Sequence, residues 1–234
     1  MGNNIKLFCV PFSGGNAYSF AGFRKYLPDN IELCNLELPG RGKRICEPLL
    51  YTIEEMTEDL YNLIKNNIDG NYAIFGHSLG SLLGYTLAKH ITDKGENLPL
   101  MLFLSGNNAP SLIKRDDRYK LTDNEFINML REMEGTPEEL LADKSFIEFF
   151  LPVIKADFQS IANYTYTAPN DFLNIPITVM YGSEEDIDES EFDFWQLETN
   201  KAISMNCFYG GHFYIFDQTE KICNLIVEKL KMTL

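Results

Sequence analysis

Residues 72–91 read YAIFGHSLGSLLGYTLAKHI, and this stretch decides the fold. Its first four residues form an apolar run typical of a buried strand, and from Leu79 onward apolar side chains recur at spacings of three and four, which is typical of a helix. A sharp turn between such elements strains its central residue, and glycines two positions to either side leave room for the chain to close. Gly76 and Gly80 flank Ser78 in this way. The stretch therefore predicts a serine nucleophile, Ser78, projecting above a sheet.

The rest of the chain repeats this alternation of short apolar runs and longer stretches of helical period. The strand candidates are Ile5–Val10, Ile31–Leu38, Tyr72–Phe75, Leu100–Leu104, Ile177–Tyr181 and Ile203–Phe208. The helix candidates between and after them are Ile53–Ile68, Leu79–Ile91 and Asp217–Leu230. Such alternation is the signature of a mostly parallel sheet covered by helices, so the predicted class is α/β.

One interval has no strand candidate. Residues 111–170 contain only charged amphipathic stretches where a short crossover would suffice, which indicates a helical insertion over one end of the sheet. Parallel sheets bind ligands at strand ends, so an insertion placed there could act as a lid. We expect one domain over residues 1–234 that carries this insertion.

Composition excludes several classes of protein. Lys and Arg total 20 against 34 Asp and Glu, a formal charge of −14, whereas nucleic-acid binding requires clustered positive charge. The longest apolar run, Leu98–Leu104, is far shorter than the roughly 20 residues of a membrane helix. We find no leader pattern and expect a cytoplasmic monomer. The five cysteines are scattered singly and the three histidines lie far apart, so we expect reduced thiols and no metal site.

A serine hydroxyl needs a base to accept its proton, and a histidine is the candidate. His77 neighbours Ser78, so its side chain should point away from the serine and pack. His90 lies about three helical turns beyond Ser78, too far from the serine to accept its proton. His212 remains, in a glycine-rich loop after the last strand candidate, and we identify it as the general base.

The third member of such a triad is a carboxylate that fixes the imidazole tautomer, and in this type of fold it lies between the serine and the histidine. The acids that directly follow a strand lie in residues 184–188. Asp186 is our first choice because a short side chain fits a tight loop. Glu185 and Asp188 remain alternatives.

The developing oxyanion of acyl transfer requires two backbone N–H donors. Leu79, directly after the nucleophile, should supply one. The loop Pro11-Phe12-Ser13-Gly14-Gly15 follows the first strand candidate, and its paired glycines suit a backbone-presenting loop, so we assign the Ser13 N–H as the second. A plain glycine turn is the alternative.

The sequence resembles the type II thioesterases of nonribosomal peptide and polyketide synthesis, which belong to the α/β-hydrolase superfamily. The similar segments, in chain order, are Pro11 to Gly15 with Phe20, Leu38-Pro39-Gly40-Arg41-Gly42 with Arg44, Gly76 to Gly80, Leu151-Pro152 through Ala156-Asp157 with Tyr164, Pro176-Ile177 into Gly182, and Gly210 to Phe213. The Arg41 and Asp157 segments are more specific to the family than the serine turn.

The resemblance implies hydrolysis of acyl groups from the phosphopantetheine arm of carrier proteins through an acyl-serine, with no cofactor. It assigns Ser78 as nucleophile, His212 as base and an acid after Gly182. The interval from Asp186 to His212 is similar to that of the family, although the acidic cluster blurs the match. Ser13 stands where the family more often has Ala. A carboxylesterase or lipase acting on small free esters, and a non-catalytic protein that binds acyl carriers, remain alternative functions.

Carrier domains are usually acidic, so a chain of charge −14 should need positive charge where they dock. The basic clusters are Arg24-Lys25, Arg41 to Arg44, and Lys114-Arg115 with Arg118. We expect Arg41, Arg44 and Arg115 to flank the entrance and contact the carrier or its phosphate. Ordinary solvated surface charge is the alternative.

Overall fold

The computed structural model describes residues 4–133, 136, 138–168, 172–185 and 189–233. Within them lies one parallel sheet in the order β2-β1-β3-β4-β5-β6. The strands are β1 (Ile5–Val10), β2 (Ile31–Asn35), β3 (Tyr72–His77), β4 (Leu102–Ser105), β5 (Ile177–Gly182) and β6 (Ile203–Phe208). The predicted α/β class is confirmed, with each predicted strand present and its ends shifted by a few residues at most.

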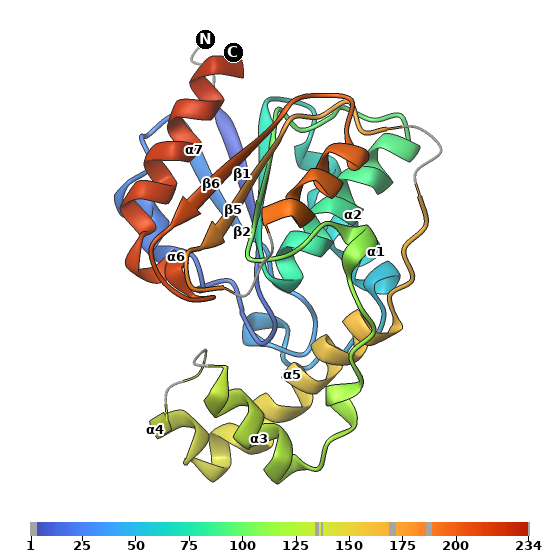
Figure 1. The fold of residues 1–234 in the computed structure, drawn as a ribbon, viewed down its shortest axis with the longest axis vertical. Helices are drawn as coiled ribbons and strands as arrows, with labels where there is room; N and C mark the ends of the chain where they lie inside the picture. The colour runs from blue at the N-terminus through green and yellow to red at the C-terminus, as the bar shows by residue number, and fades with distance from the viewer. Residues whose placement is uncertain (1–3, 134–135, 137, 169–171, 186–188, 234) are drawn as a thin grey trace.

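Helices cover both faces of the sheet (Figure 1). One face carries α1 (Ile53–Ile64) and α2 (Leu79–Asp93), and the other carries α7 (Thr219–Thr233), preceded by the short α6 (Tyr214–Asp217). Side chains of a strand alternate between faces. Ile74 of β3 accordingly packs in the α1–α2 core, whereas Phe75 packs in the α7 core. Burial on both faces explains why the inner strands β1, β3, β4 and β5 are mainly apolar.

The predicted insertion lies between β4 and β5, beyond the carboxyl ends of the strands (Figure 1). It contains α3 (Asp123–Glu132), α4 (Glu138–Leu141) and α5 (Lys144–Asn163). Local sequence starts two of these helices: Thr122 forms a capping box with Glu125, and Asp143 accepts from the first backbone N–H groups of α5. A separate apolar cluster joins the helices, formed by Phe126, Leu130, Leu141, Leu151, Ile154 and Phe158.

Short 3₁₀ helices complete the described chain. They are η1 (Ala21–Lys25), η2 (Gly42–Arg44), η3 (Lys65–Asn67), η4 (Pro110–Leu112), η5 (Asp117–Lys120) and η6 (Glu189–Glu198). The sequence analysis did not foresee η6, whose Trp195 is buried against Tyr85 of α2. Of the helices formed by described residues, none is both long and apolar enough to cross a membrane.

His77 ends β3 in full burial, as the sequence suggested for a packing residue. Its Nδ1 lies 2.9 Å from the Ser105 hydroxyl, its register partner on β4, and that hydroxyl lies 2.5 Å from the Tyr214 hydroxyl. Burial, together with the nearby His212, lowers the pKa of His77 well below its usual value. The ring therefore stays neutral inside the core.

We expect His77→Gln to reduce the acid sensitivity of folding. Below about pH 6.5 an unfolded histidine binds a proton, whereas the folded protein keeps His77 neutral. The unfolded state then binds more protons, so the free energy of unfolding decreases as the pH is lowered, by up to about 1.4 kcal/mol per pH unit from this group. Urea unfolding at pH 7 and pH 5 measures the difference.

Ser105→Ala is the matched control, because it removes the hydrogen bond but keeps the buried imidazole. It should lower stability at both pH values and retain the wild-type pH slope. An identical pH slope in wild type and His77→Gln would contradict the assignment of this acid sensitivity to His77.

Candidate active site

Ser78 occupies the turn between β3 and α2 with φ 55° and ψ −119°, and it is the one non-glycine residue with positive φ in the described part of the chain. Such a conformation costs about 1–3 kcal/mol and persists only where neighbours enforce it. The Ser78 N–H donates to the Ser105 carbonyl at 2.8 Å, and Asn107 Nδ2 donates to the Ser78 carbonyl at 3.1 Å. The predicted strained turn is present.

The two flanking glycines are required by close approach of backbones. A Cβ at Gly76 would collide with the backbone of Gly80, and a Cβ at Gly80 would collide with the carbonyl of Val10. The first turn of α2 thus lies directly against β3 and β1. This contact brings Ser78 beside the loop that follows β1.

His212 lies in the loop after β6, and its Nδ1 is 2.6 Å from Glu185 Oε1. The other oxygen of Glu185 accepts from the Gly182 N–H at 2.7 Å. Backbone hydrogen bonds join the two loops, from Ser183 to Phe208 and from Glu184 to Gly210. Because an ionised carboxylate only accepts hydrogen bonds, Nδ1 donates to Glu185, and in the neutral imidazole this tautomer leaves the lone pair on Nε2.

The acid beside His212 is therefore an alternative from the sequence analysis rather than its first choice. Asp186 and Asp188 lie outside the described residues. The argument that a short side chain suits a tight loop did not anticipate Glu185, whose longer side chain spans the distance from the end of β5 to the imidazole. The glutamate side chain is 8% exposed and that of His212 28% exposed.

His77 lies against this base. The two imidazole rings are 4.9 Å apart between centroids, and the His77 ring is neutral because burial lowers its pKa. A neutral neighbour adds no positive charge next to His212 when the latter accepts a proton. His77 thus packs against the base without competing with it.

The proposed oxyanion donors lie on the same side of the sheet. Leu79 is the first residue of α2, so its N–H has no acceptor within the helix. The loop after β1 forms a turn in which the Gly15 N–H donates to the Phe12 carbonyl at 2.8 Å. Ser13 and Leu79 both line the cavity that Ser78 and His212 line. Four of the predicted residues, Ser13, Ser78, Leu79 and His212, thus line one cavity.

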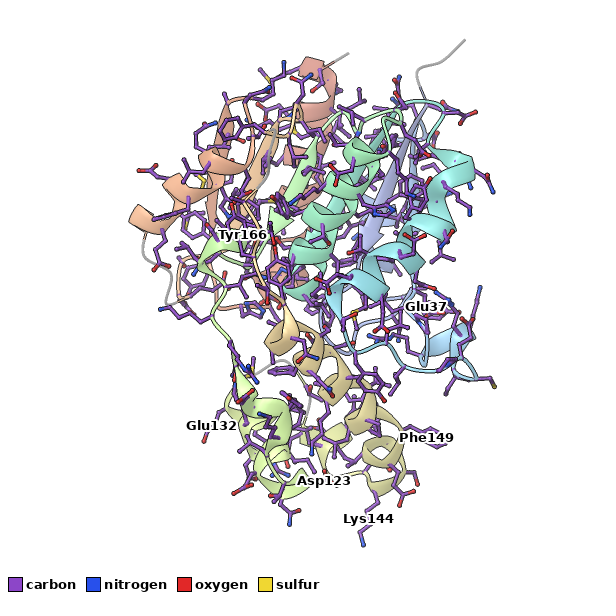
Figure 2. All side chains as sticks on the ribbon, turned by 90° about the vertical axis from the view of Figure 1, so that its right-hand side faces the viewer. Glu37, Asp123, Glu132, Lys144, Phe149 and Tyr166 are labelled. Atoms are coloured by element: carbon purple, nitrogen blue, oxygen red, sulfur yellow. The ribbon has the colours of Figure 1, made fainter. Side chains whose placement is uncertain are left out.

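A cavity of about 690 Å³ separates these residues from the insertion. On the insertion side its wall combines a charged run at residues 114–118 with apolar side chains, which include Ile113, Leu130, Met133, Phe150, Ile154, Phe158 and Ile161. Phe149, one residue from Phe150 on α5, instead points outward from the molecule (Figure 2) and is 69% exposed. The cavity suits an apolar chain whose reactive end reaches Ser78.

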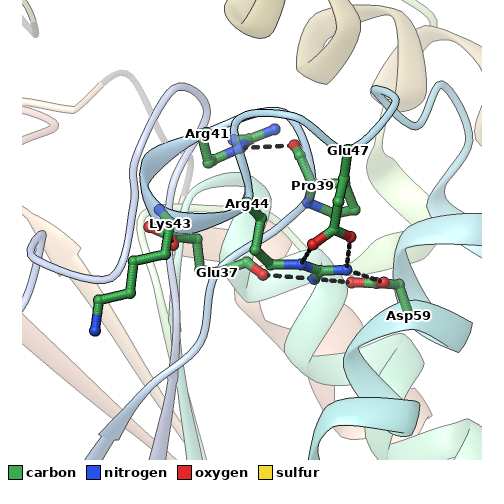
Figure 3. A network of polar contacts seen from close by, with 7 residues as sticks. All are labelled: Glu37, Pro39, Arg41, Lys43, Arg44, Glu47 and Asp59. Carbon is green, nitrogen blue, oxygen red and sulfur yellow. Dashed lines mark hydrogen bonds and ion pairs between the residues drawn. The ribbon is translucent and has the colours of Figure 1, made fainter.

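Two of the three arginines expected to contact a carrier have other partners. Arg41 is buried and forms a bidentate ion pair with the fully buried Asp157 of α5, at 2.7 and 2.8 Å. Arg44 lies between Glu47 and Asp59 and also donates to the Glu37 carbonyl (Figure 3). These guanidinium groups brace the loop after β2, which corrects the docking role assigned to them.

Arg115 differs from both, because its side chain is 66% exposed, pairs with Asp117 at 3.2 Å and lines the cavity. Asp157 belongs to one of the family-like segments, but the sequence alone indicates no role for it. Asn107 lacks a motif of its own, so no sequence signal pointed to its contact with Ser78. In the described part of the chain no group of three or more His, Cys, Asp or Glu side chains is arranged to hold a metal ion.

Comparison with known proteins adds to this geometry. Residues 5–230 match the thioesterase domain family. The chain is 31% identical over 232 residues to the gramicidin S biosynthesis protein GrsT of Aneurinibacillus migulanus, covering 98% of this chain and 90% of that protein. It is 30% identical over 231 residues to thioesterase PikA5 of Streptomyces venezuelae, covering 98% and 82%.

Solved structures are similar over the same length. ClbQ from the colibactin NRPS/PKS pathway has a TM-score of 0.93 and 32% identity, with 98% of each chain covered. The type II thioesterase BorB from the borrelidin biosynthetic cluster has a TM-score of 0.89 and 28% identity, with 98% and 94% covered. The chain is therefore a serine hydrolase of the thioesterase family, with the α/β-hydrolase fold.

Proposed function

We propose that this thioesterase hydrolyses acyl groups from the phosphopantetheine arm of carrier proteins, releasing or editing intermediates of nonribosomal peptide or polyketide synthesis. The observation that carries the proposal is that Ser78, His212, Ser13 and Leu79 line one cavity with a mainly apolar wall. Relatives of similar length supply the context, since GrsT is named for gramicidin S biosynthesis and ClbQ for an NRPS/PKS pathway.

In the first step Ser78 Oγ attacks the thioester carbonyl carbon while His212 Nε2 accepts its proton. The N–H groups of Ser13 and Leu79 hold the oxyanion, and the thiol leaves with the proton from His212 to give an acyl-serine. Water that loses a proton to His212 then attacks the acyl carbon; the bond to Ser78 Oγ breaks as this oxygen takes the proton back from His212, which releases the acid and restores the serine. Glu185 keeps the Nδ1–H tautomer and stabilises the protonated imidazole throughout.

The insertion acts as a lid in this scheme. Its helices α3 and α5 supply apolar cavity wall opposite Ser78, so an acyl chain would lie between them and the sheet edge. A closed insertion excludes water, which strengthens the oxyanion contacts. We further propose a cytoplasmic monomer; the five singly scattered cysteines support the compartment, since cytosolic thiols stay reduced.

We expect Ser78→Ala to abolish deacylation of an acyl-carrier protein, with kcat lower by at least about 10³-fold, because no other group replaces the nucleophile. Intact mass of the carrier before and after mixing measures the reaction. A fluorophosphonate should label wild type and not the variant. Absence of labelling in wild type would favour a protein that only binds carriers.

A comparison of two substrates tests the substrate class. Wild type should show a higher kcat/KM on acyl carrier than on a nitrophenyl ester of the same acyl group. The reverse order would favour a carboxylesterase.

We expect Glu185→Gln to lower kcat by on the order of 10²–10⁴, because an amide can stabilise the wrong imidazole tautomer and removes the negative charge beside it. The matched control is Glu184→Gln, which changes an exposed neighbouring carboxylate and should leave kcat unchanged. Asp186→Asn tests the other assignment. A large loss in Asp186→Asn with normal activity in Glu185→Gln would contradict the role of Glu185.

Carrier docking is proposed at Lys114 and Arg115, which are exposed at the cavity wall. Their charge offers an acidic carrier a local attraction on a chain of net charge −14. Asp116 and Asp117 line the same wall, so the attraction is confined to a small area.

We expect the double variant Lys114→Glu, Arg115→Glu to raise KM for acyl carrier about 3–10-fold relative to KM for the corresponding N-acetylcysteamine thioester, because the reversed charges repel an acidic carrier, whereas the small thioester has no negative charge for them to repel. Lys231→Glu, on the exposed end of α7, carries a charge change of the same sign per residue and should leave the ratio unchanged. Equal changes in both KM values would contradict docking at this position.

A further inference from the structure

The ion pair between Arg41 and Asp157 is buried, yet its carboxylate also contacts the loop after β1. Asp157 Oδ2 accepts from the Gly14 N–H at 2.7 Å and from Arg41 Nη1 at 2.8 Å, while Oδ1 accepts from Arg41 Nη2 at 2.7 Å. Arg41 Nη1 further donates to the Gly15 carbonyl at 3.4 Å. Two neighbouring residues of the loop are thus held by one buried pair.

The loop has a geometry that this contact would fix. The Gly15 N–H donates to the Phe12 carbonyl, and Gly14 has φ +76°, the pattern of a type II turn with Ser13 and Gly14 at its centre. Type I and type II turns differ by a flip of the central peptide. The hydrogen bond from Gly14 to Asp157 holds that peptide in one orientation.

Packing adds to the same constraint. A Cβ at Gly14 would lie 2.8 Å from Ile154 Cγ1 and 2.8 Å from Phe150 Cζ, so α5 lies directly on the turn. In the described part of the chain the N–H groups of Gly14 and Gly15 both have acceptors, whereas the Ser13 N–H donates to none. Ser13 also lines the cavity beside Ser78.

A buried ion pair is weak evidence for stability, because desolvation of the two charges offsets much of their attraction. An oxyanion donor, in contrast, is effective only when its position is set before charge develops. We propose that Asp157, held by Arg41, is a positioning residue of the oxyanion hole: it fixes the turn so that the Ser13 N–H faces the reacting carbonyl oxygen. The insertion and the oxyanion hole thereby form one unit.

This inference rests on the proposed function, since it takes Ser13 as an oxyanion donor. It is tested with Asp157→Asn, which keeps the shape of the side chain but loses the charge. On an N-acetylcysteamine thioester, kcat should fall about 10–100-fold with KM within about twofold of wild type, because the oxyanion contact is made in the transition state.

Two inhibitors separate positioning from structure. Ser78 Oγ adds to the carbonyl carbon of an acyl trifluoromethyl ketone, its proton passes to His212, and the C=O electron pair moves to the oxygen, giving an oxyanion. The corresponding thioether has no carbonyl. Asp157→Asn should raise the Kd of the ketone by the same factor by which it lowers kcat. The Kd of the thioether should stay within about twofold of its wild-type value.

The matched control is Asp123→Asn. It breaks the ion pair of Asp123 with Lys155, which is also on α5, at 2.6 Å, but Asp123 makes no contact with the turn among the described residues. It should leave kcat and both affinities unchanged. A parallel loss of both inhibitors in Asp157→Asn, or a kcat equal to that of Asp123→Asn, would overturn the proposal.

A measurement on wild type covers the case in which Asp157→Asn does not fold. With ¹⁵N-labelled Ser and Gly, the Gly14 amide should be protected from exchange in the free enzyme. Binding of the ketone should move the Ser13 amide resonance downfield and leave that of Gly14 in place. Movement of Gly14 instead of Ser13 would show that Asp157 does not hold Gly14.

The failures of the two proposals differ. Wild type without thioesterase activity or labelling at Ser78 would refute the proposed function. Active wild type together with unaltered Asp157→Asn would refute the positioning role alone.

Discussion

The left-handed backbone of Ser78 is the constraint on which the rest of the site depends. A serine at φ 55° stores about 1–3 kcal/mol of strain, and hydrogen bonds from both of its backbone groups hold it in place. The turn can close only because Gly76 and Gly80 allow α2 to lie against β3 and β1. Without that contact, the helix N-terminus and the loop after β1 would not meet at one cavity.

The second constraint joins the insertion to the sheet edge. The insertion has its own apolar cluster, so its helices are held to one another without the main core. Its attachment to the loop after β1 includes a buried polar contact, the ion pair of Arg41 with Asp157, beside the apolar packing of Ile154 and Phe150 on Gly14. A specific polar contact restricts geometry more than apolar packing does, because a misplaced partner leaves a buried charge uncompensated.

Charged residues in this molecule either contribute to the charge of the surface or form structural ion pairs. The net charge of −14 belongs to the chain as a whole, yet two arginines form structural ion pairs, Arg41 with Asp157 and Arg44 with Asp59 and Glu47. Counting basic residues in the sequence therefore overestimates the positive surface available to a partner. Arg115 remains exposed, and even this residue has an acidic neighbour within 3.2 Å.

The sequence by itself determined the six strands and the principal helices; it also predicted a helical block between β4 and β5 and pointed to Ser78 and His212, which line one cavity in the structure. These follow from local properties: apolar periodicity, turn glycines and the scarcity of histidine. It did not determine η6, which buries Trp195 without a regular pattern of its own.

Only the tertiary structure decided which described acid meets His212 and which arginines are buried. The loop at residues 184–188 offers four carboxylates in five positions, and one residue of register changes which of them points at the imidazole. Likewise, Arg41 and Asp157 are 116 residues apart, and no local pattern records that they pair. Pairings of this kind arise from packing between distant segments, so they become visible only when those segments are placed side by side.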